Sequence, residues 1–401
     1  MIPDLAAEAL VGAGVRLVSG VPCSVLDPLS NALRRRSDIT YVPAVDEGEA
    51  LAMAAGGWLG GALGAVLLQN SGLGNVVNPL SSLCLPYRIP AVLIVSWRGR
   101  PGDDDAPHHV PMGSATMAIL KTFDIPHHVL DAADDVTQVV ANLAATATAT
   151  RRPAALVVPK GTFPATAAAR AAQHELFLEE RLMLQTAEPV MFQSAGIRAT
   201  RSQIVDTTLT AFPHAAVVST TGYMSRALAA RGAESRWFPM QGSMGYACAL
   251  ALGVAEMRPR VPVVVLDGDG AILMRLGSLA TVGNRRPPAF VHVVSDNGTY
   301  ASTGGQPTAS AGVRLELIAA ACGYRFVAVS AGASCLQASI KWAHERVGAG
   351  PVFLRASMST EEDTVAARPS SDPADISCSF RAHLAPGLTS KPLPPPAGDV
   401  A

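Results

Sequence analysis

The sequence has little charge and few aromatic residues. Only 16% of its 401 residues are Asp, Glu, Lys or Arg and only 5% are Phe, Trp or Tyr, whereas 49% are hydrophobic. The formal net charge is −1, and the basic run at 34–36 is just three arginines long. Such a composition excludes a disordered chain, and it lacks the basic patch that nucleic-acid binding requires. At this length it predicts a large buried core shared by two or three domains.

The sequence also has little that would predict disulfides, a signal peptide or a membrane span. The six cysteines are scattered with no CxxC spacing, which predicts free thiols in a reducing compartment. The first residues, MIPDLAAEALVGAG, are acidic and helical, unlike a signal peptide. No apolar run reaches the roughly 18 residues of a transmembrane helix. We therefore expect a cytoplasmic protein with no membrane partner.

Short apolar runs alternate with helical patterns in both halves of the chain. This alternation predicts parallel sheets covered on both faces by helices, and so an α/β protein of two doubly wound domains without a third, central domain. We place the first domain at residues 1–165 and the second at 198–385. Between them lies a helical, Ala- and Glu-rich connector at 166–197, and a Pro-rich tail follows at 386–401.

Two apolar runs in the second half end in polar turns. The first ends in Gly268-Asp269-Gly270 and the second in Asp296-Asn297-Gly298, and Asn297 lies 28 positions after Asp269. This spacing fits a strand, loop, helix and second parallel strand, so both turns would lie at the sheet edge where such folds bind ligands. Carboxylate and amide oxygens are ligands that bind Mg²⁺. Backbone N–H groups next to glycine, which no side chain covers, can donate hydrogen bonds to phosphate.

Ordinary explanations exist for each of these segments. A GDG turn is common between a strand and a helix. The glycine loop at 70–75 is not a dinucleotide fingerprint, because Val77 stands where the third glycine belongs and no acidic residue ends the next strand candidate. His108 and His109 have no third ligand at metal spacing. A glycine loop that faces a cofactor or substrate is the better interpretation of 70–75.

In register with one another, the motifs resemble those of thiamin diphosphate enzymes, where GDG is followed by Asn some 25 to 30 residues later. The resemblance implies that Asp269, Asn297 and the main-chain carbonyl of Thr299 hold Mg²⁺, which bridges to the cofactor's diphosphate. It implies that Met244, in a GSMG turn at the start of a helix predicted at 243–256, holds the cofactor in its V shape and that Gly242 contacts its pyrimidine amino group through the main chain. The implied cofactor-binding residues are Asn70, Gly72, Gly242, Ser243, Met244, Gly268, Asp269, Gly270 and Asn297.

The resemblance also implies a catalytic residue in the first half. Glu47 stands at a strand-to-helix junction, where these enzymes place the carboxylate that hydrogen-bonds a pyrimidine nitrogen and activates the cofactor. Glu49 would point elsewhere. Because the pyrimidine and diphosphate ends meet domains of different subunits in this family, at least a homodimer is implied, with its active sites at the subunit interface.

Longer strings resemble one branch of the family, the phosphonopyruvate decarboxylases, with the sulfopyruvate decarboxylases close behind. The most specific are NSGLGNVVNPL at 70–80 and STGGQPT at 302–308. His109 and the WRG triplet at 97–99 favour the phosphonate branch, whereas VPMG at 110–113 looks more like the sulfonate branch. The substrate-binding candidates are Ser24, Trp97, Arg98, His109 and Tyr300.

The implied activity is decarboxylation of 3-phosphonopyruvate to phosphonoacetaldehyde in phosphonate biosynthesis. One alternative is another thiamin diphosphate enzyme, either a sulfopyruvate decarboxylase or a different 2-keto acid decarboxylase or carboligase. The other is a non-enzymatic or nucleotide-binding α/β protein. Two departures bear on the site. Asp27 stands where members often have a basic residue, and Thr299-Tyr300 stands where they often show a histidine after NNGx. Tyr300 is the candidate to replace that histidine as a proton donor.

Overall fold

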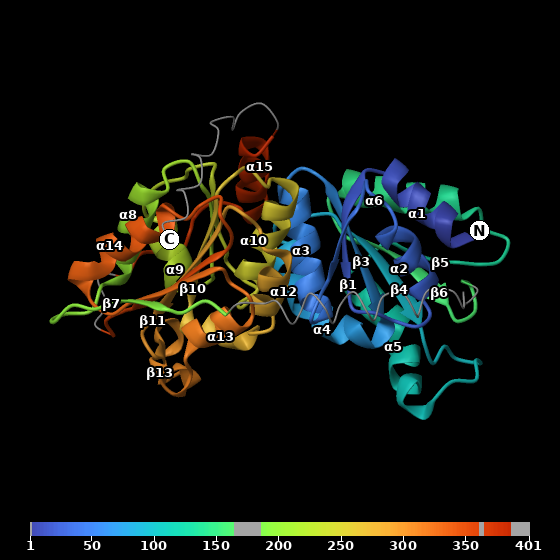
Figure 1. Cartoon of the computed structure of the whole chain (residues 1–401). Helices are drawn as coiled ribbons and strands as arrows, with labels where there is room; N and C mark the ends of the chain where they lie inside the picture. Colours follow the sequence, from blue (N-terminus) through green and yellow to red (C-terminus); the bar gives the residue numbers. More distant parts are fainter. Residues whose placement is uncertain (1, 164–185, 361–364, 386–401) are drawn as a thin grey trace. The chain divides into compact units, whose positions relative to one another are not determined.

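The computed structural model describes residues 2–163, 186–360 and 365–385. Contacts divide the chain into two compact units, Met1–Leu184 and Gln185–Ala401. Each unit contains one parallel sheet with helices packed on it (Figure 1), which confirms the predicted fold class of two doubly wound α/β domains. Among these residues no helix is both long and apolar enough to cross a membrane. The predicted tail at 386–401 lies outside the described residues.

The first unit is built on a six-stranded sheet in the order β2-β1-β3-β4-β6-β5, in which every pair is parallel. Its strands are β1 (Val15–Gly20), β2 (Thr40–Pro43), β3 (Leu63–Gln69), β4 (Val92–Trp97), β5 (His127–Val129) and β6 (Ala154–Pro159), and its helices are α1 (Ile2–Gly12), α2 (Asp27–Arg34), α3 (Glu47–Leu59), α4 (Leu73–Pro79), α5 (Val110–Thr122) and α6 (Val136–Thr150).

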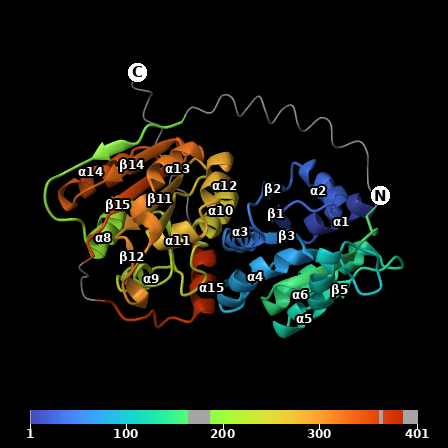
Figure 2. The same cartoon turned by 90° about the horizontal axis from the view of Figure 1, so that it is seen from below.

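Helix α3 packs unusually close to this sheet. A Cβ on Gly57 would lie 2.8 Å from Leu17 Cδ2, and one on Gly64 would lie 2.6 Å from the Ala54 carbonyl oxygen, so these positions require glycine. Figure 2 shows α3 on the opposite side of β1 and β3 from α1 and α2. Helices α1, α2 and α6 form one core with the alternate strand residues. The close packing of α3 fixes the position of its first residue, Glu47, at the carboxyl edge of the sheet.

The second unit contains a seven-stranded parallel sheet in the order β7-β14-β15-β11-β10-β8-β9. Its strands are β7 (Val190–Phe192), β8 (Ala216–Ser219), β9 (Trp237–Pro239), β10 (Val263–Gly268), β11 (Phe290–Asp296), β14 (Phe326–Ser330) and β15 (Val352–Ser357), and β12 (Thr299–Tyr300) pairs separately with β13 (Gln306–Pro307). The helices are α8 (Arg201–Ala211), α9 (Tyr223–Ala229), α10 (Ala247–Met257), α11 (Asp269–Met274), α12 (Ser278–Arg285), α13 (Leu315–Ala321), α14 (Ala333–His344) and α15 (Pro373–His383).

The predicted βαβ unit is present in the second unit. Strands β10 and β11 pair in parallel from Val263 with Phe290 to Gly268 with Ser295, and α11 and α12 connect them. Figure 1 shows α8, α9 and α14 on one side of these strands and α10, α12 and α13 on the other. The strands are buried on both faces, so their sequences are continuous apolar runs rather than alternating ones.

Three local predictions are wrong. The loop at 70–75 is a 3₁₀ turn, Asn70–Gly72, that leads directly into α4. The described part of the predicted helical connector contains strand β7, which forms because β14 offers it a parallel pairing edge. The helix expected from residue 243 starts only at Ala247, because Ser243 (φ +52°) and Gly245 (φ +90°) adopt left-handed backbone conformations that no α-helix contains.

Candidate active site

A pocket at the carboxyl edge of the second sheet gathers most of the predicted cofactor residues of that unit. It lies where β8, β10 and β11 end, the position at which parallel sheets bind ligands. Gly242 and Ser243 are not among the residues that line it. The predicted residues that line it are Met244, Gly268, Asp269, Gly270, Asn297, Thr299 and Tyr300.

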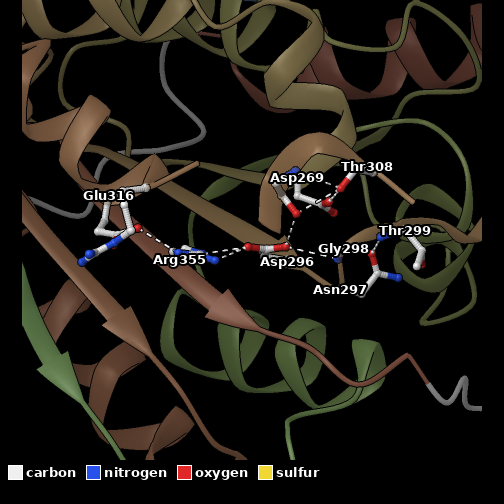
Figure 3. A network of polar contacts seen from close by, with 10 residues as sticks. Asp269, Asp296, Asn297, Gly298, Thr299, Thr308, Glu316 and Arg355 are labelled. Carbon is white, nitrogen blue, oxygen red and sulfur yellow. Dashed lines mark hydrogen bonds and ion pairs between the residues drawn. The ribbon is translucent and has the colours of Figure 1, made fainter. Parts of the chain in front are cut away.

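Asp269 is the first residue of α11 and its carboxylate is buried. The hydroxyl of Thr308 donates a hydrogen bond to its Oδ2 (Figure 3). Burial raises the pKa of the Asp269 carboxyl above its ordinary value, and the nearby charge of Asp296 raises it further. A bound cation would favour the ionised form, so this environment fits a carboxylate that serves as a metal ligand.

Asn297 and Thr299 follow the last residue of β11. Asn297 Oδ1 accepts a hydrogen bond from the Thr299 backbone N–H at 3.1 Å, and Gly298 between them adopts φ +70° (Figure 3). Within the described residues, no three His, Cys, Asp or Glu side chains gather as a metal site. The predicted set instead combines a carboxylate, an amide and a backbone carbonyl, the hard oxygen ligands that suit Mg²⁺.

Two buried hydroxyls in the same pocket support an anionic ligand. Thr220 Oγ1 and Ser295 Oγ have no hydrogen-bond partner among the described residues, although both residues are buried and line the pocket. Buried polar atoms are normally paired, so these hydroxyls fit a ligand that brings its own oxygens, such as a diphosphate. The sequence analysis missed both residues: Thr220 directly follows β8, and Ser295 lies within β11.

Gly270 allows Tyr300 to reach the pocket. A Cβ on Gly270 would lie 2.3 Å from Tyr300 Cε1, so the last glycine of the GDG turn makes room for the tyrosine ring. Gly245 has a similar part in the turn that carries Met244, because a Cβ there would lie 2.9 Å from the Arg275 side chain. One glycine of each motif, Gly270 and Gly245, is therefore required by packing around the pocket, whereas a Cβ on Gly268 would meet no atom within 4 Å.

Glu47 lies at the start of α3 in the first unit. Asp46 caps the helix, with its Oδ1 accepting hydrogen bonds from the N–H groups of Gly48 (2.7 Å) and Glu49 (3.1 Å). The Glu47 side chain is only 9% exposed, and Asn75 Nδ2 donates to its Oε2 at 2.7 Å. The Glu49 carboxylate is turned to the backbone, where Oε2 accepts from the Val45 N–H at 2.7 Å.

Gly72 packs directly against the Glu47 carboxylate. A Cβ at this position would lie 2.4 Å from Glu47 Cδ, whereas a Cβ on Gly74 would meet no atom within 4 Å. We expect Gly72→Ala to lower the free energy of unfolding by about 1–3 kcal/mol, because the added methyl group overpacks the site. Gly74→Ala is the matched control and should not destabilise the protein. Urea denaturation measures both; equal stability of the two variants would contradict this packing.

Asn70 connects three segments of the first unit. Its Nδ2 donates to the Arg98 carbonyl (2.8 Å) and to Thr116 Oγ1 (2.9 Å), and its Oδ1 accepts from the Arg98 N–H (3.2 Å). Both ends of the amide thus contact the protein itself. Asn70 joins the end of β3 to the loop after β4 and to α5, and so positions Arg98.

Two of the predicted substrate residues lie where β4 ends, since Trp97 is its last residue and Arg98 begins the loop that follows. Arg98 donates from Nε and Nη2 to Asp105 at 2.7 and 2.6 Å, and this guanidinium holds the pKa of the Asp105 carboxyl well below its usual range. Trp97 Nε1 donates to the Gly113 carbonyl at 2.8 Å, and a Cβ on Gly113 would lie 1.7 Å from the Gly99 carbonyl oxygen. This close contact joins the loop to the start of α5.

His109 stands just before α5, with its ring 4.0 Å from that of His108. Burial lowers the pKa of His109, and the charge of Arg98 lowers it further. A Cβ on Gly99 would lie 2.3 Å from the His109 carbonyl oxygen, so the loop that begins with Arg98 packs against His109. Ser24 is exposed, and its side chain makes no hydrogen bond to the described residues.

Two family models match the chain. One, described as "Thiamine pyrophosphate enzyme, N-terminal TPP binding domain", matches residues 2–125, and its counterpart, "Thiamine pyrophosphate enzyme, C-terminal TPP binding domain", matches residues 216–356. Thiamine pyrophosphate is another name for thiamin diphosphate. The two matches fall in different units, and the second spans the βαβ segment and its pocket.

Relatives with similar sequences are decarboxylases. The phosphonopyruvate decarboxylase of Streptomyces viridochromogenes is 41% identical over 99% of this chain and 98% of its own length. The sulfopyruvate decarboxylase of Methanosarcina acetivorans is 27% identical over 79% of this chain and 81% of its own. A solved structure, the thiamine diphosphate-dependent 4-hydroxybenzoylformate decarboxylase of Rhodococcus jostii RHA1, matches with a TM-score of 0.69 over 90% of this chain and all of that one, and at 15% identity it supports the fold alone.

Proposed function

Because the chain belongs to the phosphonopyruvate decarboxylase family of thiamin diphosphate enzymes, we propose that it converts 3-phosphonopyruvate to phosphonoacetaldehyde and CO₂ in phosphonate biosynthesis, with thiamin diphosphate and Mg²⁺ bound. The observation that carries the choice of substrate is the 41% identity to a phosphonopyruvate decarboxylase over nearly the whole chain, against 27% to a sulfopyruvate decarboxylase over 79% of it. Chain length does not separate the two, because that sulfopyruvate enzyme also spans most of this chain.

Glu47 is the proposed catalytic carboxylate of the first unit. When bound, thiamin diphosphate supplies the electron sink that loss of CO₂ from a 2-keto acid requires. Asn75 binds one carboxylate oxygen of Glu47, and Oε1 has no hydrogen-bond partner among the described residues. Oε1 is therefore the atom proposed to exchange a proton with the pyrimidine ring of the cofactor. Gly72 keeps this carboxylate in place by packing against it.

The pocket of the second unit is proposed to hold the diphosphate end of the cofactor. Asp269, Asn297 and the carbonyl of Thr299 would bind Mg²⁺, since together they offer the oxygens that this ion prefers. The buried hydroxyls of Thr220 and Ser295 would then donate to diphosphate oxygens. From the turn before α10, Gly242 would contribute its main chain with Ser243 beside it, and the half-buried Met244 an apolar surface for the cofactor.

Arg98 and His109 are proposed to bind the phosphonate group of the substrate. Asp105 orients Arg98 through Nε and Nη2, and Nη1 has no acceptor among the described residues. Charge-assisted hydrogen bonds from a guanidinium suit a phosphonate, so this nitrogen is the proposed contact. Trp97 and Ser24 are proposed as further pocket members. Tyr300 is the proposed donor of the proton that replaces CO₂.

The active protein is proposed to be at least a homodimer with small anionic 2-keto acids as substrates. This follows the resemblance to enzymes in which the two cofactor-binding domains of one site come from different subunits. Glu47 belongs to the first unit and Asp269 to the second, so each complete site needs both kinds of domain. No further partner is proposed.

The substrate is tested with purified protein supplied with thiamin diphosphate and Mg²⁺. We expect kcat/KM for phosphonopyruvate to exceed that for pyruvate by at least about 100-fold. Pyruvate lacks the phosphonate group and would leave the proposed anion site without its charge-assisted hydrogen bonds. Release of CO₂ and formation of the aldehyde are measured with phosphonopyruvate, sulfopyruvate and pyruvate in parallel. Aldehyde formed from sulfopyruvate alone would overturn the substrate, and turnover of none of the three would overturn the decarboxylase assignment.

A further inference from the structure

The end of β11 presents two adjacent polar residues that face different partners. Asn297 is the proposed Mg²⁺ ligand, whereas the carboxylate of Asp296 before it points toward Arg355 on the neighbouring strand β15 (Figure 3). A second carboxylate this near to Asp269 is unexpected at a site with one cation and a diphosphate. Its surroundings explain how the fold accommodates it.

All the contacts of the Asp296 carboxylate are with the protein itself. Oδ1 accepts from the Gly298 N–H (3.2 Å) and from Ser310 Oγ (2.9 Å), and Oδ2 accepts from Arg355 Nε (2.7 Å) with Nη2 also 2.7 Å away. The Asp296 side chain is 7% exposed. Its two oxygens are thus saturated, and the Gly298 bond shapes the turn that carries Asn297 and Thr299.

Arg355 is itself fixed from the other side. Its Nη1 donates to Glu316 Oε2 on α13 at 3.0 Å, and Glu316 in turn pairs with Arg314. Arg355 therefore lies between the buried carboxylates of Asp296 and Glu316, and both fix the position of its guanidinium group. Arg314 contacts only the outer carboxylate and is 63% exposed.

The contact between Asp296 and Asp269 runs through two hydroxyls. Thr308 donates to Asp269, Ser310 donates to Asp296, and the two hydroxyl oxygens lie 3.0 Å apart. An Asp296 that lost its cation would carry an uncompensated buried charge next to the metal site, where it would compete for Mg²⁺ and repel a diphosphate.

We propose that Arg355 is a positioning residue of the cofactor site: it neutralises Asp296 and turns its carboxylate toward β15, so that Asp269 provides the charge and Asn297 and Thr299 the neutral oxygens for Mg²⁺. This inference rests on the proposed Mg²⁺–thiamin diphosphate site. It assigns Arg355 no contact with cofactor or substrate, and its effect is exerted through Asp296.

The test measures thiamin diphosphate binding by titration calorimetry across Mg²⁺ concentrations, with the whole protein. We expect Arg355→Met to weaken Mg²⁺-dependent binding by about 10- to 100-fold, the usual effect of removing a residue that supports a metal site without binding the ion. The double variant Asp296→Asn with Arg355→Met should recover to within a few fold of wild type, because the asparagine brings no charge that needs a cation. Its amide oxygen can still accept from the Gly298 N–H.

Two controls separate this role from a purely structural one. Arg314→Met removes a cation from Glu316 without touching Asp296 and should leave binding unchanged. Thermal unfolding of each cofactor-free variant shows that it is folded. Unchanged binding by Arg355→Met, or a double variant as weak as the single one, would overturn the inference. Absence of Mg²⁺-dependent binding by the wild-type protein would instead overturn the proposed site itself.

Discussion

Replacing Glu47 by Gln is expected to lower kcat by roughly 10²- to 10⁴-fold, the usual contribution of a general acid or base. The side chain keeps its shape, and its amide oxygen can still accept the hydrogen bond from Asn75. Thiamin diphosphate affinity should therefore change little while turnover is lost. Steady-state kinetics at saturating cofactor and a binding titration measure the two effects separately.

Glu49 provides the matched control on the same helix. It is also a buried glutamate, but its Oε2 accepts from the backbone N–H of Val45, whereas Oε2 of Glu47 accepts from the Asn75 side chain. Glu49→Gln should lower the free energy of unfolding by about 1–3 kcal/mol, because a charged hydrogen bond is weakened, and leave kcat near its wild-type value. Near wild-type turnover by Glu47→Gln, or an equal loss in both variants, would remove Glu47 from its proposed role.

Loss of Asp269 is expected to abolish the Mg²⁺ dependence of cofactor binding. Asp269→Ala removes the only carboxylate among the proposed ligands, so affinity for thiamin diphosphate should fall by more than the roughly 100-fold that loss of an outer-shell residue causes. Titration with and without Mg²⁺ measures the change. Asp206→Ala is the control, since this carboxylate of the same unit is 59% exposed and pairs with Arg231 on the surface. Unchanged affinity in Asp269→Ala, with the same dependence on Mg²⁺, would remove Asp269 from the proposed metal site.

The same two variants test whether sites are shared between subunits. Consider a purified mixed dimer of one Glu47→Gln chain and one Asp269→Ala chain. If each active site takes Glu47 from one subunit and Asp269 from the other, one of the two sites carries both substitutions and the other carries neither. Such a dimer should recover roughly half of wild-type activity, as two-fold symmetry requires. A mixed dimer as inactive as its parents would show that both residues of a site belong to one chain.

The strand and helix pattern was predictable because it depends on neighbours in the sequence. The end of β10 is visible in the sequence because an apolar run stops at the glycines of the GDG turn. Helix α3 begins at Glu47 because Asp46 caps it. Elements that depend on distant pairing were harder to predict. Strand β7 was expected to be helical, and only the open edge of β14 makes it a strand.

The sequence by itself determined that Asp269 and Asn297 would meet at one sheet edge, because a βαβ unit places consecutive strand ends together. Only the tertiary structure decided which groups surround them. Thr308 reaches Asp269 across 39 residues, Arg355 reaches Asp296 across 59, and Asn75 reaches Glu47 across 28. No local periodicity encodes such contacts, because they join a strand, helix or loop to an element far away in the sequence that only the folded chain brings close.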